Sequence, residues 1–162
     1  MQVLFIRHAT AQETHKAGDA RRKLTKKGID EAKMLAEALE AMGLAVDVLL
    51  TSPLDRAVQT AAIVGEMLDV QPREALFLAA EDGHAQIRAQ LDELARQGVK
   101  SVAMVGHSPI SEEMIGELIA GNPHVGLSIS KAGAAMVQTA EGSQDAELMW
   151  LLRRKQIELM QP

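Results

Sequence analysis

Residues 3–8 read Val-Leu-Phe-Ile-Arg-His, four consecutive apolar side chains followed at once by two polar ones. A continuous apolar run of this length is typical of a strand that is buried on both faces, as in the centre of a parallel sheet. Residues 102–105 repeat the pattern, residues 46–50 repeat it with an interruption at Asp47, and residues 75–78 form a weaker fourth run. The sequence therefore predicts four strands of a largely parallel sheet.

Between and after these runs, apolar residues recur with the period of an α-helix. The first expected helix covers residues 26–42, with Thr25 as its cap and Gly43 as its stop. Three further helices are expected, opening at Ser52-Pro53, covering residues 84–97, and running from Pro109 to near Gly121.

Two more strands are predicted near the end of the chain, at residues 134–139 and 147–152, with a turn at residues 141–143 between them. The alternation of strands and helices predicts an α/β fold, with a mostly parallel central sheet, helices on both faces and an antiparallel edge strand. Because no repeat, low-complexity tract or linker interrupts the pattern, residues 1–162 are predicted to form a single domain.

The composition excludes several classes of function. The formal net charge is −5, and one Trp, two Phe and no Tyr leave little surface on which bases could stack, so no nucleic acid partner is expected. The absence of cysteine excludes disulfides, thiolate metal sites and cysteine nucleophiles. The first apolar run is only four residues long, too short for a signal peptide or a membrane span, so we expect a cytoplasmic protein with no membrane contact.

Polar clusters follow three of the predicted strands. Arg7-His8 follows the first, residues 52–56 (Ser-Pro-Leu-Asp-Arg) follow the second, and residues 106–109 (Gly-His-Ser-Pro) follow the strand at 102–105. Because ligands bind at the carboxyl ends of the strands in open α/β sheets, we expect these clusters to surround one pocket.

The residue types in these clusters predict an oxyanion site. Arginine forks bind the oxygens of a phosphoryl group, and the first turns of two helices contribute unpaired N–H groups. His8 is then the candidate nucleophile, because nearby cations would depress its pKa and keep the imidazole neutral. A single histidine after a strand, or a single arginine on a helix, would be interpreted as structural, so the hypothesis depends on the three clusters meeting.

These motifs resemble the histidine phosphatase superfamily: Arg7-His8 after an N-terminal strand, Ser52-Pro53-x-x-Arg56, and Gly106-His107 after a late strand. The chain's short length and Leu24-Thr25-x-x-Gly28 are most similar to the SixA-type phosphohistidine phosphatases. The resemblance implies that His8 is phosphorylated, that Arg7, Arg56 and His107 hold the phosphoryl group, and that Arg22 touches it. It implies neither a cofactor nor a metal.

Two positions depart from the family or are ambiguous. Ala9 stands where the family has glycine, which would be costly if the backbone there needed a positive φ or a close approach. Glu81, in the loop before the third helix, is the candidate general acid, and its alternative interpretation is a solvated loop residue.

The first hypothesis is a metal-independent phosphatase that dephosphorylates phosphohistidine on a phosphotransfer protein. One alternative is a small-molecule phosphomonoesterase, and another, motivated by Ala9, is a phosphate-binding module that has lost turnover. A metal hydrolase using His8 and His107 is disfavoured, because Arg7 and Arg56 would repel a cation and no carboxylate accompanies either histidine motif.

Overall fold

The computed structural model describes residues 1–140 and 145–160 and is built on a six-stranded sheet. The strand order is β3-β2-β4-β1-β5-β6, which confirms the predicted α/β fold. The bounds of the strands are β1 Gln2–Arg7, β2 Val48–Thr51, β3 Pro72–Glu74, β4 Ser101–Gly106, β5 Ala134–Thr139 and β6 Ala146–Leu152.

The first four strands in chain order run parallel, and the last two form the antiparallel edge. Strand β4 lies between β1 and β2 and pairs in parallel with both, while β2 also pairs in parallel with β3. Strand β5 runs antiparallel to β1, and β6 antiparallel to β5. The carboxyl ends of β1, β2 and β4 therefore lie next to one another at the same edge of the sheet.

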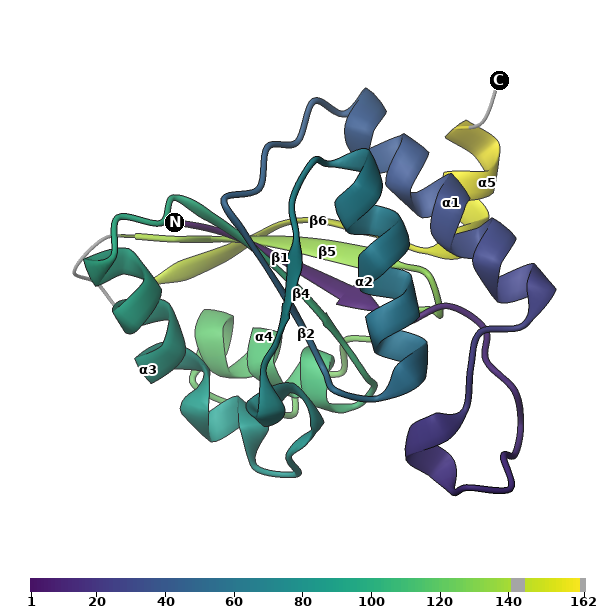
Figure 1. The fold of residues 1–162 in the computed structure, drawn as a ribbon. Helices are drawn as coiled ribbons and strands as arrows, with labels where there is room; N and C mark the ends of the chain where they lie inside the picture. The colour runs from purple at the N-terminus through teal and green to yellow at the C-terminus, as the bar shows by residue number, and fades with distance from the viewer. Residues whose placement is uncertain (141–144, 161–162) are drawn as a thin grey trace.

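Helices cover both faces of the sheet, as Figure 1 shows. One face packs against α1, α2 and α5, and the opposite face against α3 and α4. The bounds of the helices are α1 Lys26–Ala41, α2 Asp55–Met67, α3 Gly83–Arg96, α4 Ile110–Ala120 and α5 Arg154–Met160, with short 3-10 helices η1 Asp19–Arg21 and η2 Leu76–Ala79. Apolar side chains of the sheet fill both layers, because β1 and β4 are buried along nearly their whole length.

Two local predictions are wrong, and two short elements were not predicted. Residues 76–78 fall in η2 with Ala75 as its N-cap, and the short strand β3 precedes them, because the apolar residues Phe77 and Leu78 pack under α3 and α4 from a helical turn. Ser52-Pro53 does not open α2, whose N-cap is Leu54. The sequence patterns also missed α5 and η1, which are only 7 and 3 residues long. The predicted turn at residues 141–143 lies outside the described residues.

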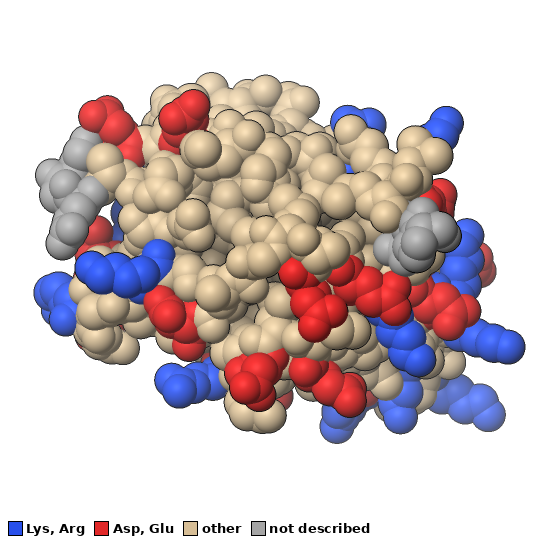
Figure 2. All heavy atoms as spheres, turned by 90° about the horizontal axis from the view of Figure 1, so that it is seen from above, with Lys and Arg blue, Asp and Glu red and all other residues tan. Residues whose placement is uncertain are grey.

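Charged side chains are mixed on the surface that Figure 2 views from above. A large uncharged area reaches the upper rim of this face, Asp and Glu gather below its middle, and Lys and Arg lie mainly toward its left and right sides, so no continuous basic surface spans the described residues of this face. None of the helices in the described ranges is long and apolar enough to cross a membrane.

Candidate active site

Main-chain hydrogen bonds hold the three polar clusters together at the carboxyl edge of the sheet. The N–H of His8 donates to the carbonyl of Gly106 at 3.0 Å, and the N–H of Ser52 donates to the carbonyl of Val105 at 2.9 Å. The structure thus brings His8, Arg56 and His107 to one place, with Arg7 at the end of β1 beside them. We refer to Arg7, His8, Arg56 and His107 as the cradle.

His8 is buried, and its tautomer follows from one contact. Its ring Nδ1 lies 2.7 Å from the carbonyl oxygen of Ala9. Because a carbonyl can only accept, Nδ1 carries the proton, and Nε2 has a free lone pair. The backbone therefore presents His8 as a neutral imidazole with Nε2 as its nucleophilic atom.

His107 lies beside His8, with the ring centroids 5.0 Å apart. Its Nε2 lies 2.7 Å from Oγ of Ser52, which in turn accepts a hydrogen bond from the N–H of Leu54 at 3.4 Å. A neutral His107 whose Nε2 accepts from the Ser52 hydroxyl has its proton on Nδ1. That Nδ1 is buried and has no hydrogen-bond partner among the described residues. The arrangement leaves a donor available at the cradle.

Burial keeps both histidines neutral. Loss of solvent is the largest cause that lowers the pKa of His8 to about 4, and the charges of Arg56, Arg7 and Lys131 lower it further against the opposing hydrogen bond to Ala9. The pKa of His107 falls to about 3, again chiefly by burial and then by His8 and Arg56. Both imidazoles are therefore uncharged at neutral pH.

The two arginines of the cradle are oriented by main-chain carbonyls. Arg7 Nη1 donates to the carbonyl of Ile129 at 2.8 Å, and Arg56 Nη1 donates to the carbonyl of Asp19 at 2.9 Å. Each guanidinium also has a buried Nε with no partner in the described part of the chain. Arg56 is 7% exposed, so its charge acts in a poorly solvated environment.

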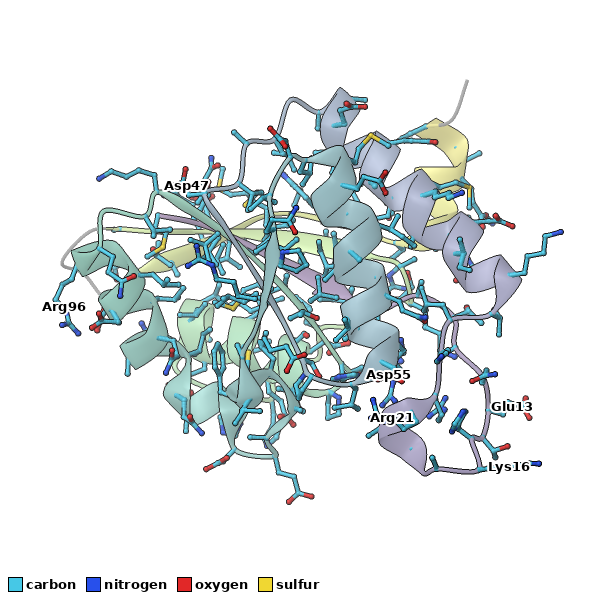
Figure 3. All side chains as sticks on the ribbon, in the orientation of Figure 1. Glu13, Lys16, Arg21, Asp47, Asp55 and Arg96 are labelled. Atoms are coloured by element: carbon cyan, nitrogen blue, oxygen red, sulfur yellow. The ribbon has the colours of Figure 1, made fainter. Side chains whose placement is uncertain are left out.

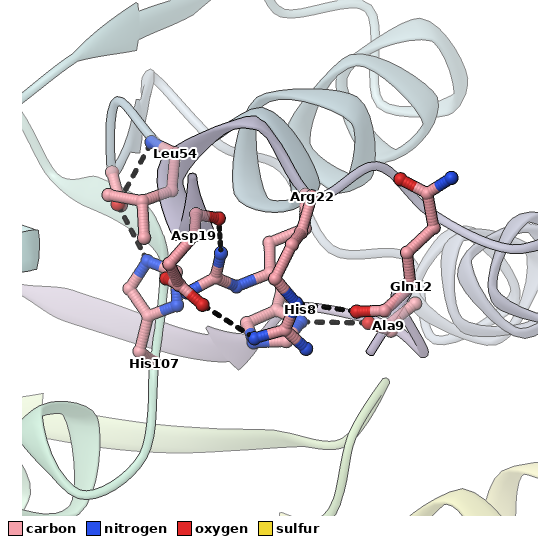
Figure 4. A network of polar contacts seen from close by, with 9 residues as sticks. His8, Ala9, Gln12, Asp19, Arg22, Leu54 and His107 are labelled. Carbon is pink, nitrogen blue, oxygen red and sulfur yellow. Dashed lines mark hydrogen bonds and ion pairs between the residues drawn. The ribbon is translucent and has the colours of Figure 1, made fainter. Parts of the chain in front are cut away.

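Residues 12–23 form a loop over the cradle, which we call the mouth loop, drawn in purple at the lower right of Figure 1. An isolated bridge between Ala11 and Leu24 closes its base. Asp19 of this loop joins two arginines, because its Oδ2 lies 3.0 Å from Arg56 Nη2 and its Oδ1 lies 2.7 Å from Arg22 Nη1 (Figure 4). The loop is thereby connected to the cradle through a carboxylate.

Arg22, the predicted phosphate-touching residue, lies in the mouth loop, and within the described residues it is linked to the cradle through Asp19. Its Nε donates to the carbonyl of Gln12 and its Nη1 pairs with Asp19. Arg22 is thus placed one side chain away from Arg56.

Glu81, the predicted general acid, is not placed in this cluster. It is exposed in the turn before α3 and forms no hydrogen bond or ion pair within the described residues. The structure favours its interpretation as a solvated loop residue.

Ala9 is fully buried and fits its position. Its N–H donates to Thr60 Oγ1 at 3.2 Å, and its side chain packs in a small cluster with Ala11, Leu24 and Ala32. Among the described residues, the only non-glycine residues with positive φ are Asp69 and Ala132, so the backbone at Ala9 does not require glycine.

A second layer supports the segment that follows His8. The N–H of Thr10 donates to Oε2 of the buried Glu31 at 3.0 Å, and Oε1 of the same carboxylate accepts from Arg154 of α5 at 2.8 Å. A Cβ at Gly28 would lie 1.9 Å from the carbonyl oxygen of Thr10. The first turn of α1 therefore approaches the nucleophile segment so closely that only glycine fits there.

Sequence patterns missed Asp19, Lys131 and Glu112. Asp19 lies 37 positions before Arg56 in a segment without helical or strand period, and Lys131 sits in the turn before β5. Glu112 Oε1 accepts a hydrogen bond from the N–H of Ile129 at 3.0 Å, and the carbonyl of Ile129 accepts one from Arg7. The sequence does not mark Glu112 either, because α4 also carries Glu113 and Glu117.

In the described residues, no three His, Asp or Glu side chains group as metal ligands would. The cradle contains only cationic and neutral groups, a donor set that matches an anion.

Comparisons with known proteins agree with this geometry. The model of the histidine phosphatase superfamily (branch 1) matches residues 3–77. Phosphohistidine phosphatase SixA of Escherichia coli (strain K12) is 32% identical over 123 residues, which are 75% of this chain and 76% of that protein. A solved structure of the protein histidine phosphatase SixA complexed with tungstate has a TM-score of 0.86 at 28% identity, covering 96% of this chain and 98% of that one.

A more distant structure shares the fold alone. The putative alpha-ribazole-5'-P phosphatase from Escherichia coli str. K-12 substr. MG1655 has a TM-score of 0.76 at 19% identity, covering 95% of this chain and 97% of the other. The fold is thus common to proteins whose substrates differ.

Proposed function

Because this chain belongs to the histidine phosphatase superfamily, we propose that it transfers the phosphoryl group of its substrate to Nε2 of His8 and then to water. The observation that carries the proposal is the hydrogen bond from His8 Nδ1 to the carbonyl of Ala9, which leaves Nε2 unprotonated. Nucleophilic attack requires that free lone pair, and the low pKa of His8 preserves it at neutral pH.

Arg7, Arg56 and His107 are the proposed phosphate-binding residues. Three of their nitrogen atoms, Arg7 Nε, Arg56 Nε and His107 Nδ1, are buried without a partner in the described part of the chain. A buried donor without an acceptor is costly, and phosphoryl oxygens would supply acceptors to all three. The charge on the equatorial oxygens would be balanced by two guanidinium groups.

The reaction proceeds in two displacements. The Nε2 lone pair of His8 forms a bond to phosphorus while the bond to the leaving group breaks and takes its electron pair with it. The resulting phosphoimidazolium keeps its proton on Nδ1, which donates a hydrogen bond to the carbonyl of Ala9. Water then attacks phosphorus, the electron pair of the P–N bond returns to Nε2, and the water protons leave with the phosphate. No metal ion enters either step, and we expect turnover to survive EDTA.

The proposed substrate is phosphohistidine on a phosphotransfer protein, and the proposed process is protein dephosphorylation. Two observations support it: the similarity to a protein named phosphohistidine phosphatase SixA, and a cradle bordered by an exposed loop rather than by an enclosing domain. Because two neutral imidazoles would exchange the phosphoryl group, the first step is close to balanced in energy. A cytoplasmic location and the identity of the partner protein stay predictions.

A small phosphomonoester is the second candidate substrate, because the transfer to His8 does not itself depend on which atom leaves. A phosphate-binding module without turnover is less well supported, since the backbone at Ala9 does not require a glycine.

The test is to trap the phosphorylated enzyme. We expect wild-type protein mixed with a phosphohistidine peptide and quenched under non-acidic conditions to gain one phosphoryl group, located on His8 by mass spectrometry. His8→Asn should gain none, and His84→Asn, which removes a histidine of α3, should label as wild type does. Labelling of another residue, or phosphate release without any label, would overturn the proposal.

A further inference from the structure

We propose that Asp19 selects the leaving group: its carboxylate accepts a hydrogen bond from the ring N–H of a phosphorylated imidazole and so favours phosphohistidine over phosphate esters. The role depends on His8 acting as proposed above. The observations behind it are the contacts, the exposure and the charge of Asp19.

Asp19 is bound to the cradle and still has hydrogen-bonding capacity. Its Oδ2 accepts from Arg56 at 3.0 Å and its Oδ1 from Arg22 at 2.7 Å. A carboxylate has about four acceptor positions, so about two remain free. The side chain is 64% exposed, which makes the free positions accessible to a group that enters from solvent. Arg56 likewise keeps about three of its five N–H groups for a phosphoryl group.

Asp19 is ionised when substrate binds. Its hydrogen bond with Arg22, followed by its interactions with Arg56, holds the pKa of Asp19 below its usual value. Its charge also reaches the cradle, because it raises the pKa of His107 against the lowering effects of burial, His8 and Arg56. Of the acidic residues in the described ranges, Asp19 alone contacts a cradle side chain directly.

A phosphorylated imidazole needs such a group. When the ring nitrogen that does not carry phosphorus is protonated, the P–N bond breaks with its electron pair moving to the other nitrogen, and a neutral imidazole leaves. Without that proton, the ring must leave as an anion. A carboxylate that accepts a hydrogen bond from this N–H stabilises the protonated ring and raises the fraction of substrate that can react.

The cradle by itself disfavours this proton. Arg7, Arg56 and Lys131 are cations near His8 and oppose a positive charge on the ring of the substrate, while His8 and His107 are neutral. Arg22 pairs with Asp19 and offsets part of its charge. Asp19 is therefore the group that can compensate the cations of the cradle.

A phosphate ester makes the opposite demand. Its leaving oxygen gains negative charge in the transition state, and a nearby carboxylate repels that charge. The same residue should thus favour one substrate class and disfavour the other.

The test compares Asp19→Asn with wild type on a phosphohistidine peptide and on an aryl phosphate. Asparagine keeps the shape and removes the charge. We expect kcat/KM for the peptide to fall about tenfold or more, as for loss of a hydrogen bond to a charged group, and kcat/KM for the aryl phosphate to stay level or rise. As pH rises, activity on the peptide should also begin to fall at a lower pH in the variant than in wild type. Without the carboxylate, the ring of the substrate loses its proton more easily.

Glu13→Gln is the matched control. Glu13 lies in the mouth loop and points away from α2 into solvent (Figure 3), so its substitution removes one charge from the loop without touching Arg56. It should leave the ratio of the two kcat/KM values unchanged.

Parallel changes would overturn the inference. An equal fall on both substrates, with weaker tungstate binding, would mean that Asp19 only holds Arg56 in place. An equal rise would mean that it only competes with phosphate for Arg56. If wild type releases phosphate but the ratio does not move, this inference fails alone, whereas a wild type inert on both substrates defeats the proposed function.

Discussion

The cradle and the mouth loop use the same kinds of charged side chain but are held in different ways. The cradle side chains of His8, Arg56 and His107 are buried and fixed by main-chain carbonyls and a serine hydroxyl. The mouth loop is largely exposed and is joined to the protein by two ion pairs, Asp19 with Arg56 and Arg21 with Asp55, the second visible in Figure 3, and by the hydrogen bond that the carbonyl of Asp19 accepts from Arg56.

The difference separates two tasks. Burial shifts the pKa values of the histidines and keeps Nε2 of His8 in place, so the cradle determines which bond can form. The ion pair of Arg21 with Asp55 lies near the surface and contributes only about 0–1 kcal/mol, so that part of the mouth loop can change without loss of the fold. It can therefore adapt to the leaving group while the bond-forming atoms stay fixed.

The largest expected effect separates the two regions directly. His8→Ala should lower kcat by at least about 10⁴-fold, because it removes the atom that forms the covalent bond. Arg22→Ala should mainly raise KM, by up to about tenfold, with kcat nearly unchanged, because a half-buried cation that is linked to the cradle through Asp19 at most attracts the ground state. Steady-state phosphate release measures both, and an equal loss of kcat would remove the distinction.

The next effect compares glycine substitutions in the backbone beside the cradle and in the mouth loop. Gly28→Ala should lower the free energy of unfolding by about 3 kcal/mol, because its Cβ would overlap the carbonyl of Thr10 beside the cradle. Gly18→Ala in the mouth loop meets nothing within 4 Å and should cost about 1 kcal/mol for its positive φ. Urea denaturation compares them, and equal costs would mean that the cradle relaxes as easily as the loop.

A smaller effect concerns pH. The folded pKa values of about 4 for His8 and about 3 for His107 lie below the unfolded value of about 6.5, so the unfolded chain binds more protons as pH falls below 6.5. Stability is therefore full above about pH 6.5 and is lost progressively toward pH 4. In His8→Asn the acid slope of the free energy of unfolding should flatten by up to about 1.4 kcal/mol per pH unit, which urea denaturation at a series of pH values measures.

The smallest effect tests the departure from the family pattern. Ala9→Gly should change kcat by only a few fold, because Ala9 already has an ordinary φ and a fitted side chain, while glycine adds freedom next to His8. Phosphate release from a phosphohistidine peptide measures it. An inert wild type that glycine activates would show that the alanine blocks the cradle.

The fold was predictable where a strand is buried on both faces and therefore consists of a continuous apolar run, as at residues 3–6 and 102–105. It was not predictable where an apolar segment is short, because Phe77 and Leu78 can bury themselves from a 3-10 turn as well as from a strand. Ser52 shows a second limit, since a residue that looks like a helix cap instead bonds to His107.

The site residues were predictable where they follow a predicted strand, and not where they lie in an irregular loop. His8, Arg56 and His107 could be grouped because each lies at or just after the carboxyl end of a strand or opens the next helix. Asp19 could not, because its position depends on how an exposed loop folds back over 37 residues of chain. Glu81 carried the right chemistry in a plausible loop, and only coordinates could show that it forms no contact with the cradle.

Strand β4 has a consequence for how the molecule is made. Strands β1 and β2 carry the nucleophile segment and the arginine segment, yet they do not pair with each other, because β4 is inserted between them. While the ribosome has released only the first hundred residues, the central position of the sheet is unfilled and His8 and Arg56 have no common support. The nascent chain is therefore expected to acquire its reactive site late, in one step, when residues 101–107 emerge and join the two halves.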